Sequence, residues 1–203
     1  MPFLKSGIYI DTSDKSYEVE SSYYLKFQIK SALISIKKLK NFEDNDFDNK
    51  YQYYHYYTDH ILYSVGQISN RFIISNNDKG VNLERKQANR QNFEFNENLY
   101  PILSDKTGRN TIEHIDEHDQ KVIKKHHGVG GFNLIDFYTD PKLVEIFYNE
   151  RKTHPYTLDL TKFEILIVRN ETNINININD LEKELVKLFE KVSYVLKYLT
   201  NIL

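Results

Sequence analysis

Residues 17–40, YEVESSYYLKFQIKSALISIKKLK, set the fold class of this chain. Apolar side chains recur along this stretch at helical spacing, at Leu25, Ile29, Ala32, Leu33, Ile36 and Leu39. A stripe with a period near 3.6 residues predicts an amphipathic α-helix that buries one face. The sequence therefore predicts a long helix close to its N-terminus.

Two more stripes of this kind follow. One predicts a helix from about Lys50 to Ile74, with an apolar face formed by Tyr54, Tyr57, Ile61, Val65, Ile68 and Phe72. The other predicts a C-terminal helix capped by Asp180, with a stripe at Leu181, Leu185, Leu188, Val192, Leu196 and Leu199. Residues 41–49 predict a loop, residues 76–80 a helix stop, and residues 83–98 a partly helical polar segment.

A small β-element is expected between residues 132 and 179. Residues 132–138 and 163–168 are rich in β-forming side chains, and Ile174, Ile176 and Ile178 alternate with asparagines. Residues 100–103 are expected to be extended, because Pro101 disfavours a helical conformation at Tyr100. The fold predicted is mainly α: one domain over residues 1–203, a helical bundle with the β-element inserted before the C-terminal helix.

Composition restricts the class of protein. With 203 residues and a net charge of -2, the chain lacks the overall basic field of a nonspecific duplex-DNA binder. It contains no cysteine, which excludes disulfides, a thiol nucleophile and cysteine-ligated metals. No apolar run is long enough to span a membrane, and the first residues lack a signal-peptide core. We expect a soluble cytoplasmic protein without membrane association.

The strongest candidate for a catalytic site is the segment Arg109-Asn110-Thr111-Ile112-Glu113-His114. On a helix, Arg109 and His114 are separated by about 140° and roughly 7.5 Å of rise, and the long arginine can reach the histidine side. Asn110 lies one turn from His114 on the same face. An arginine that stays charged and a histidine that titrates near neutrality suit attack of a ribose 2′-hydroxyl on its neighbouring phosphate. Ser104 or Asp105 is predicted to cap this helix.

This segment resembles the R-x4–6-H signature of the HEPN superfamily (higher eukaryotes and prokaryotes nucleotide-binding domains), in the form R-N-x3-H. The resemblance implies a helical bundle that acts as a metal-independent endoribonuclease without a cofactor. It also implies a homodimer in which Arg109, Asn110 and His114 of two protomers share one composite site on RNA. Many members belong to toxin–antitoxin or phage-defence systems, so an antitoxin is a further possible partner. The expected β-element departs from the simplest bundle of the family.

Other side chains around the motif offer additional chemistry. Lys121, Lys124 and Lys125 form a basic cluster that could contact an RNA backbone, or simply be the solvated side of a helix. His114 and His118 have the i, i+4 spacing of a metal site, which keeps a metallohydrolase as an alternative. A noncatalytic helical module that binds RNA, a nucleotide or a protein is the other alternative.

Two further segments are expected to be structural. The helical periodicity of residues 51–57 predicts that half of these aromatic side chains lie in the core and that the rest form a dimer surface. His55 and His60, on the same predicted helix, are expected to be structural. Residues 128–131, Gly-Val-Gly-Gly, lack the Lys and Ser/Thr of a phosphate-binding loop and predict a turn.

Overall fold

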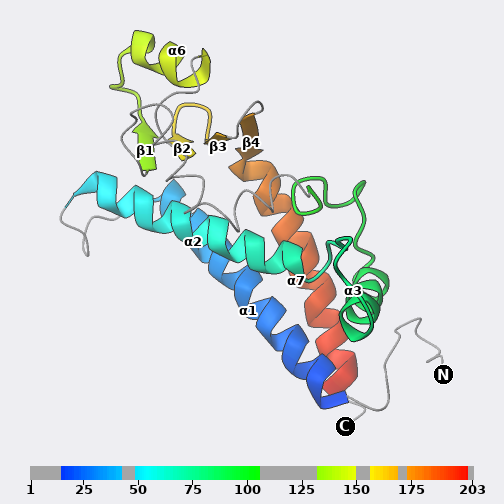
Figure 1. The fold of residues 1–203 in the computed structure, drawn as a ribbon. Coiled ribbons are helices and arrows are strands. Elements are labelled where there is room, and N and C mark those ends of the chain that lie inside the picture. The colour runs from blue at the N-terminus through cyan, green and yellow to red at the C-terminus, as the bar shows by residue number, and fades with distance from the viewer. Residues whose placement is uncertain (1–14, 43–48, 106–131, 150–155, 169–172, 201–203) are drawn as a thin grey trace.

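The computed structural model describes residues 15–42, 49–105, 132–149, 156–168 and 173–200. The elements in chain order are α1 (Lys15–Lys40), α2 (Lys50–Asn70), α3 (Val81–Asn92), β1 (Phe132–Ile135), α6 (Pro141–Asn149), β2 (Tyr156–Asp159), β3 (Glu164–Val168), β4 (Asn173–Asn177) and α7 (Ile178–Thr200). The protein is mostly helical, with a four-stranded mixed sheet before α7 (Figure 1).

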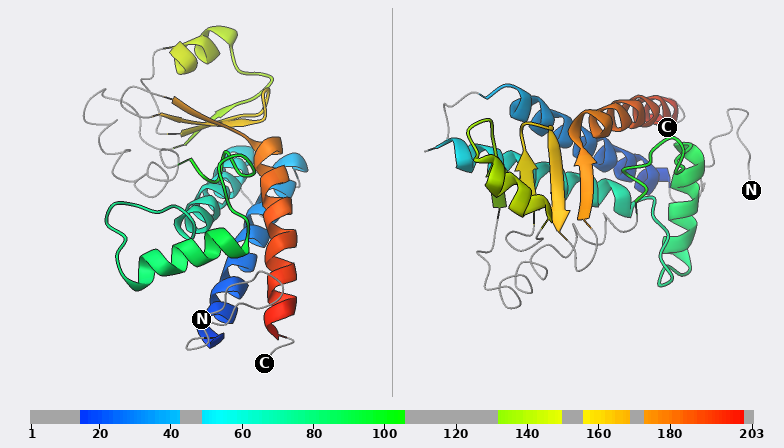
Figure 2. Two further views of the ribbon diagram at one scale, coloured as in Figure 1. Left: turned by 90° about the vertical axis from the view of Figure 1, so that its right-hand side faces the viewer. Right: turned by 90° about the horizontal axis from the view of Figure 1, so that it is seen from above.

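Three long helices form the body of the molecule. Helix α1 packs against both α2 and α7, and the sheet lies at one end of these helices (Figures 1 and 2). The three predicted stripes point into this core, as shown by the burial of Ile29 on α1, Ile61 on α2 and Leu188 on α7. The helical periodicity of the sequence therefore identified the main core correctly.

Two predicted helix boundaries were wrong. Helix α2 ends at Asn70 instead of Ile74, because the backbone turns there and the N–H groups of Phe72 and Ile73 both bond to the carbonyl of Ser69. Helix α7 begins before Asp180. The Asn177 side chain accepts hydrogen bonds from the N–H groups of residues 179 and 180, so Asn177 performs the capping predicted for Asp180. Asp180 lies in the first turn, where a carboxylate complements the positive end of the helix dipole.

The segment around Pro101 was also predicted incorrectly. Residues 101–104 form a turn instead of an extended segment. The Ser104 N–H bonds to the Tyr100 carbonyl at 2.9 Å, and the Ser104 hydroxyl donates to the same oxygen at 2.6 Å. A proline disfavours the helical conformation only for the residue before it, which here is Tyr100. The residues after Pro101 are therefore free to form a turn.

The strands pair in the order β1-β2-β3-β4. Strands β1 and β2 are parallel, and the two other pairs are antiparallel. A parallel pair needs a crossover connection, and the chain between β1 and β2 contains helix α6, which the sequence analysis did not predict. The expected strand over residues 132–138 is only four residues long and is followed by a turn.

The two faces of the sheet have different partners. Alternate residues such as Tyr156, Leu158 and Ile165 belong to the same core as the long helices. Helix α6 lies on the side of the opposite face, which includes Asp159 (Figure 2). The Tyr148 hydroxyl on α6 donates to the Asp159 carboxylate at 2.8 Å, and burial together with this bond raises the pKa of Tyr148. All four residues of β2 are buried.

Candidate functional site

The residues predicted to form the ribonuclease site lie outside the described residues. Arg109, Asn110 and His114 fall within residues 106–131, as do the basic cluster of Lys121, Lys124 and Lys125 and the alternative metal ligand His118. Their predicted roles stay predictions. What the structure shows is how the chain is held on either side of this segment.

On the N-terminal side, Glu184 of α7 holds the turn at residues 101–104. Its two carboxylate oxygens accept hydrogen bonds from the N–H groups of Ile102 and Leu103, at 2.9 and 3.0 Å. Glu184 is only 7% exposed, and burial raises the pKa of its carboxyl group although both N–H bonds favour the ionised form. A buried side chain of the C-terminal helix thus fixes the chain just before residue 106.

On the C-terminal side, Phe132 anchors the chain against α2. Its ring stacks on the His55 imidazole, with centroids 4.9 Å apart, and meets the Tyr51 ring edge-on at 5.3 Å. The Tyr51 hydroxyl donates to the Phe132 carbonyl. The chain on both sides of residues 106–131 is therefore packed against the helical core.

His55, Asp59 and Tyr156 form a polar cluster at the same seam between helix and sheet. The buried Tyr156 hydroxyl contacts the Asp59 carboxylate and lies 2.9 Å from His55 Nε2. With the phenol donating to the carboxylate, the imidazole donates to the phenol oxygen. These contacts join α2 to β2, in agreement with the structural role expected for His55.

A second polar region, with a cavity, lies at the opposite end of α2. The cavity has a volume of about 310 Å³ and is bordered by α1, α3, α7 and the end of α2. Most of its lining side chains carry charged, amide or hydroxyl groups: Glu18, Ser21, Ser22, Gln67, Asn70, Arg71, Asp78, Asn82, Arg85, Lys86, Asn89 and Asn92. Such a lining suits a polar ligand.

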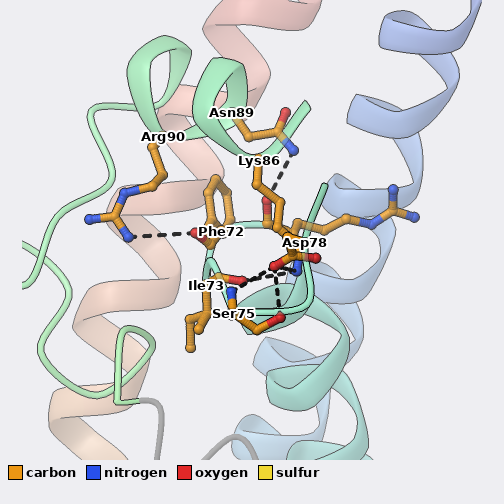
Figure 3. Close-up of polar contacts among 8 residues, drawn as sticks. Phe72, Ile73, Ser75, Asp78, Lys86, Asn89 and Arg90 are labelled. Atoms are coloured by element: carbon orange, nitrogen blue, oxygen red, sulfur yellow. Dashed lines mark hydrogen bonds and ion pairs between the residues drawn. The ribbon is translucent and has the colours of Figure 1, made fainter. Parts of the chain in front are cut away.

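Helix α3 reaches the end of α2 through three side chains (Figure 3). Lys86 Nζ donates to the carbonyl of Ile73 at 2.9 Å, and Asn89 donates to the carbonyl of Arg71 at 3.1 Å. Arg90 approaches the carbonyl of residue 72 at 3.5 Å. Three successive carbonyls that follow α2 are therefore contacted from α3, two of them by cations, which also complement the negative end of the α2 dipole.

Asp78 fixes the loop between these helices. Its carboxylate accepts from the Ser75 N–H at 2.6 Å and from the Ser75 hydroxyl at 3.0 Å, and pairs with Lys86 at 2.9 Å (Figure 3). The Ser75 N–H and the Lys86 ammonium lower the pKa of Asp78 to about 2. The hydrogen bonds from Ser75 and Lys86 thus stabilise the ionised form of the Asp78 carboxylate.

Arg71 lies at the C-cap of α2 and borders the cavity. Its guanidinium donates to the Ser21 hydroxyl at 3.2 Å and lies over the Tyr24 ring, 5.0 Å from the centroid. It forms no ion pair with any residue in the described part of the chain. This guanidinium is therefore half-buried among neutral partners.

Sequence reasoning did not identify this cavity. Arg71, Arg85 and Lys86 follow no motif spacing, and the segment 83–98 was noted only as polar. The stop predicted at residues 76–80 was the one available signal, because it indicated that α2 and the next helix join through a short loop.

Metal ligands, membrane spans and similarity to known proteins can each point to a function. Among the described residues, no group of three or more His, Cys, Asp or Glu side chains could hold a metal ion. No described helix is both long and apolar enough to cross a membrane. No protein-family profile, curated protein or solved structure matches this chain.

Proposed function

We propose that this protein is a metal-independent endoribonuclease of the HEPN type, acting as a homodimer in the cytoplasm. The observation that carries the proposal is the spacing of Arg109, Asn110 and His114 in the sequence. A toxin-like or phage-defence role, with an antitoxin as partner, belongs to the same proposal.

The proposed reaction is an internal transesterification. The ribose 2′-oxygen attacks the adjacent phosphorus and loses its proton to a base, while the 5′-oxygen leaves and takes up a proton. His114 serves as general acid and base, because an imidazole can exchange protons near neutral pH. Arg109 stabilises the charge that develops on the phosphate, and Asn110 orients the imidazole or the substrate. The products are a 2′,3′-cyclic phosphate and a 5′-hydroxyl.

The described scaffold supports this proposal in two ways. The molecule is a helical bundle of α1, α2 and α7, and the chain on either side of residues 106–131 is fixed to α7 and α2. A catalytic segment attached to rigid elements at both ends keeps its geometry better than one on a free loop.

Exposed aromatic residues on α2 support a dimer. Tyr53 and Tyr54 are buried, as the helical pattern predicted for half of this run, whereas Tyr56 is 46% exposed. Tyr63, two turns beyond Tyr56, is 58% exposed. Tyrosine is favoured at protein interfaces, so we place the contact between protomers on this face.

His114→Ala tests the proposal. We expect this variant to lose RNA cleavage by about 100-fold or more, the range that general acid–base groups contribute, in buffer containing EDTA. Cyclic-phosphate ends on a labelled RNA give the readout, and circular dichroism checks the fold. His118→Ala is the matched control, four residues away, and keeps wild-type activity under this mechanism.

Two outcomes contradict the proposal. Loss of cleavage in EDTA by the wild type and in His118→Ala would favour the metallohydrolase alternative. Equal behaviour of the wild type and His114→Ala, without cleavage by either, would favour the noncatalytic binding module.

A further inference from the structure

The cavity beside α3 contains an excess of positive charge. Five charged side chains line it: Arg71, Arg85 and Lys86 are cationic, and Glu18 and Asp78 are anionic. The Lys86–Asp78 pair, 2.9 Å apart, neutralises one charge of each sign. The five charged side chains together give the lining a net charge of +1, and Arg71 has only neutral partners among the described residues. A positive, partly dehydrated guanidinium is the group that proteins use to bind phosphate.

The neutral part of the lining suggests the rest of the ligand. Carboxamides from α2 and α3, together with Ser21 and Ser22 of α1, offer both hydrogen-bond donors and acceptors. A volume of about 310 Å³ exceeds what a bare inorganic anion occupies and lies at the lower limit of ligand pockets, which begin near 300 Å³. The chemistry that fits is an anion attached to a small body rich in hydroxyl groups.

We propose that this cavity binds a small organic phosphate, with the phosphate against Arg71 and Arg85 and the hydroxylated part against the amide side chains. This site involves none of the residues assigned to RNA cleavage. The proposal therefore goes beyond the proposed function and does not depend on it.

Binding should also stabilise the position of α3. Arg71 is fixed to α1 and the end of α2, whereas Arg85 belongs to α3, none of whose residues is buried. A phosphate held by both guanidinium groups would connect α3 to the core more firmly than its present polar contacts do. Ligand-responsive segments are generally those of low local stability.

Isothermal titration calorimetry with ribose 5-phosphate, inorganic phosphate, sulfate and ribose tests the proposal on the full chain. We expect ribose 5-phosphate to bind more tightly than either inorganic anion and ribose not to bind. Hydrogen exchange in α3 should slow when ribose 5-phosphate is present.

Charge-removing variants locate the site. Arg71→Gln and Arg85→Gln should each weaken ribose 5-phosphate binding about tenfold or more, since a charge-assisted hydrogen bond contributes roughly that factor. If Arg71→Gln fails to fold, Arg85→Gln alone tests the site. This variant should fold, because Arg85 lies on a helix without buried residues. The matched control is Lys79→Gln, which removes an exposed charge near the cavity and should leave binding unchanged.

The negative results are equally specific. Absence of binding at millimolar ribose 5-phosphate, or binding that Arg85→Gln does not weaken, would overturn the proposal. Sulfate binding as tight as ribose 5-phosphate would show an adventitious ion only. His114→Ala should bind normally, so a failure of the ribonuclease proposal and a failure of this one are distinguishable.

Discussion

Helices α7 and α3 are attached to the molecule by opposite means. Helix α7 buries a continuous apolar stripe from Ile178 to Leu199, whereas none of the 12 residues of α3 is buried. Helix α3 is held by side-chain bonds to the carbonyls that follow α2 and by aromatic residues around it, such as Phe72 and Phe93. Burial of apolar surface contributes far more net free energy than a few hydrogen bonds, each of which contributes about 1 kcal/mol. We infer that α7 fixes the fold and that α3 is the adjustable element.

The largest effect should come from truncating the α7 stripe. Leu185 is fully buried, and Leu185→Ala should lower the free energy of unfolding by about 3–5 kcal/mol through lost burial and a cavity. Urea denaturation measures this. Val186→Ala, on a residue that is 44% exposed, should change the value by less than about 0.5 kcal/mol. Equal effects of the two variants would contradict the assignment of α7 to the core.

A smaller and local effect is expected on α3. Lys86→Met removes the bond to the Ile73 carbonyl and leaves Asp78 without its cation, at a cost of about 1–3 kcal/mol. Hydrogen exchange should become faster in α3 and not in α7, because the bonds that are lost hold only α3. Gln87→Met, on an exposed position of the same helix, serves as control. Faster exchange throughout α7 would show that the two helices unfold together.

The smallest effect should be a decrease in the stabilisation that Asp78 provides as the pH becomes acidic. The pKa of Asp78 is lowered from its ordinary value of 3.8 to about 2 in the folded protein, so its ionised form is favoured by folding. This contribution to stability is fully present above pH 3.8 and is lost as pH falls through about 2. The difference in unfolding free energy between wild type and Asp78→Asn should shrink over that range. A constant difference would mean that Asp78 titrates alike in the folded and unfolded chains.

The candidate sites differ in how far sequence could predict them. The ribonuclease motif was visible because Arg109, Asn110 and His114 are close in sequence at a spacing that a helix brings together. The cavity residues were not visible in the sequence. Arg71 and Arg85 border the same cavity only because α3 folds back against the end of α2. Helix α6 was missed for a related reason: it is a short crossover required by the parallel pairing of β1 and β2, and pairing depends on residues far apart in the chain.

By itself, the sequence determined the three long helices, their buried faces and most of the strands, because periodicities of 3.6 and 2 residues are local properties of the chain. It could not distinguish Asn177 from Asp180 as the cap of α7, since both side chains can accept the same kind of bond. The order of the strands, the position of α6 beside the sheet and the cavity beside α3 were decided only by the tertiary structure. Each depends on contacts between distant segments, and the free energy of such contacts is set by how the apolar faces pack together.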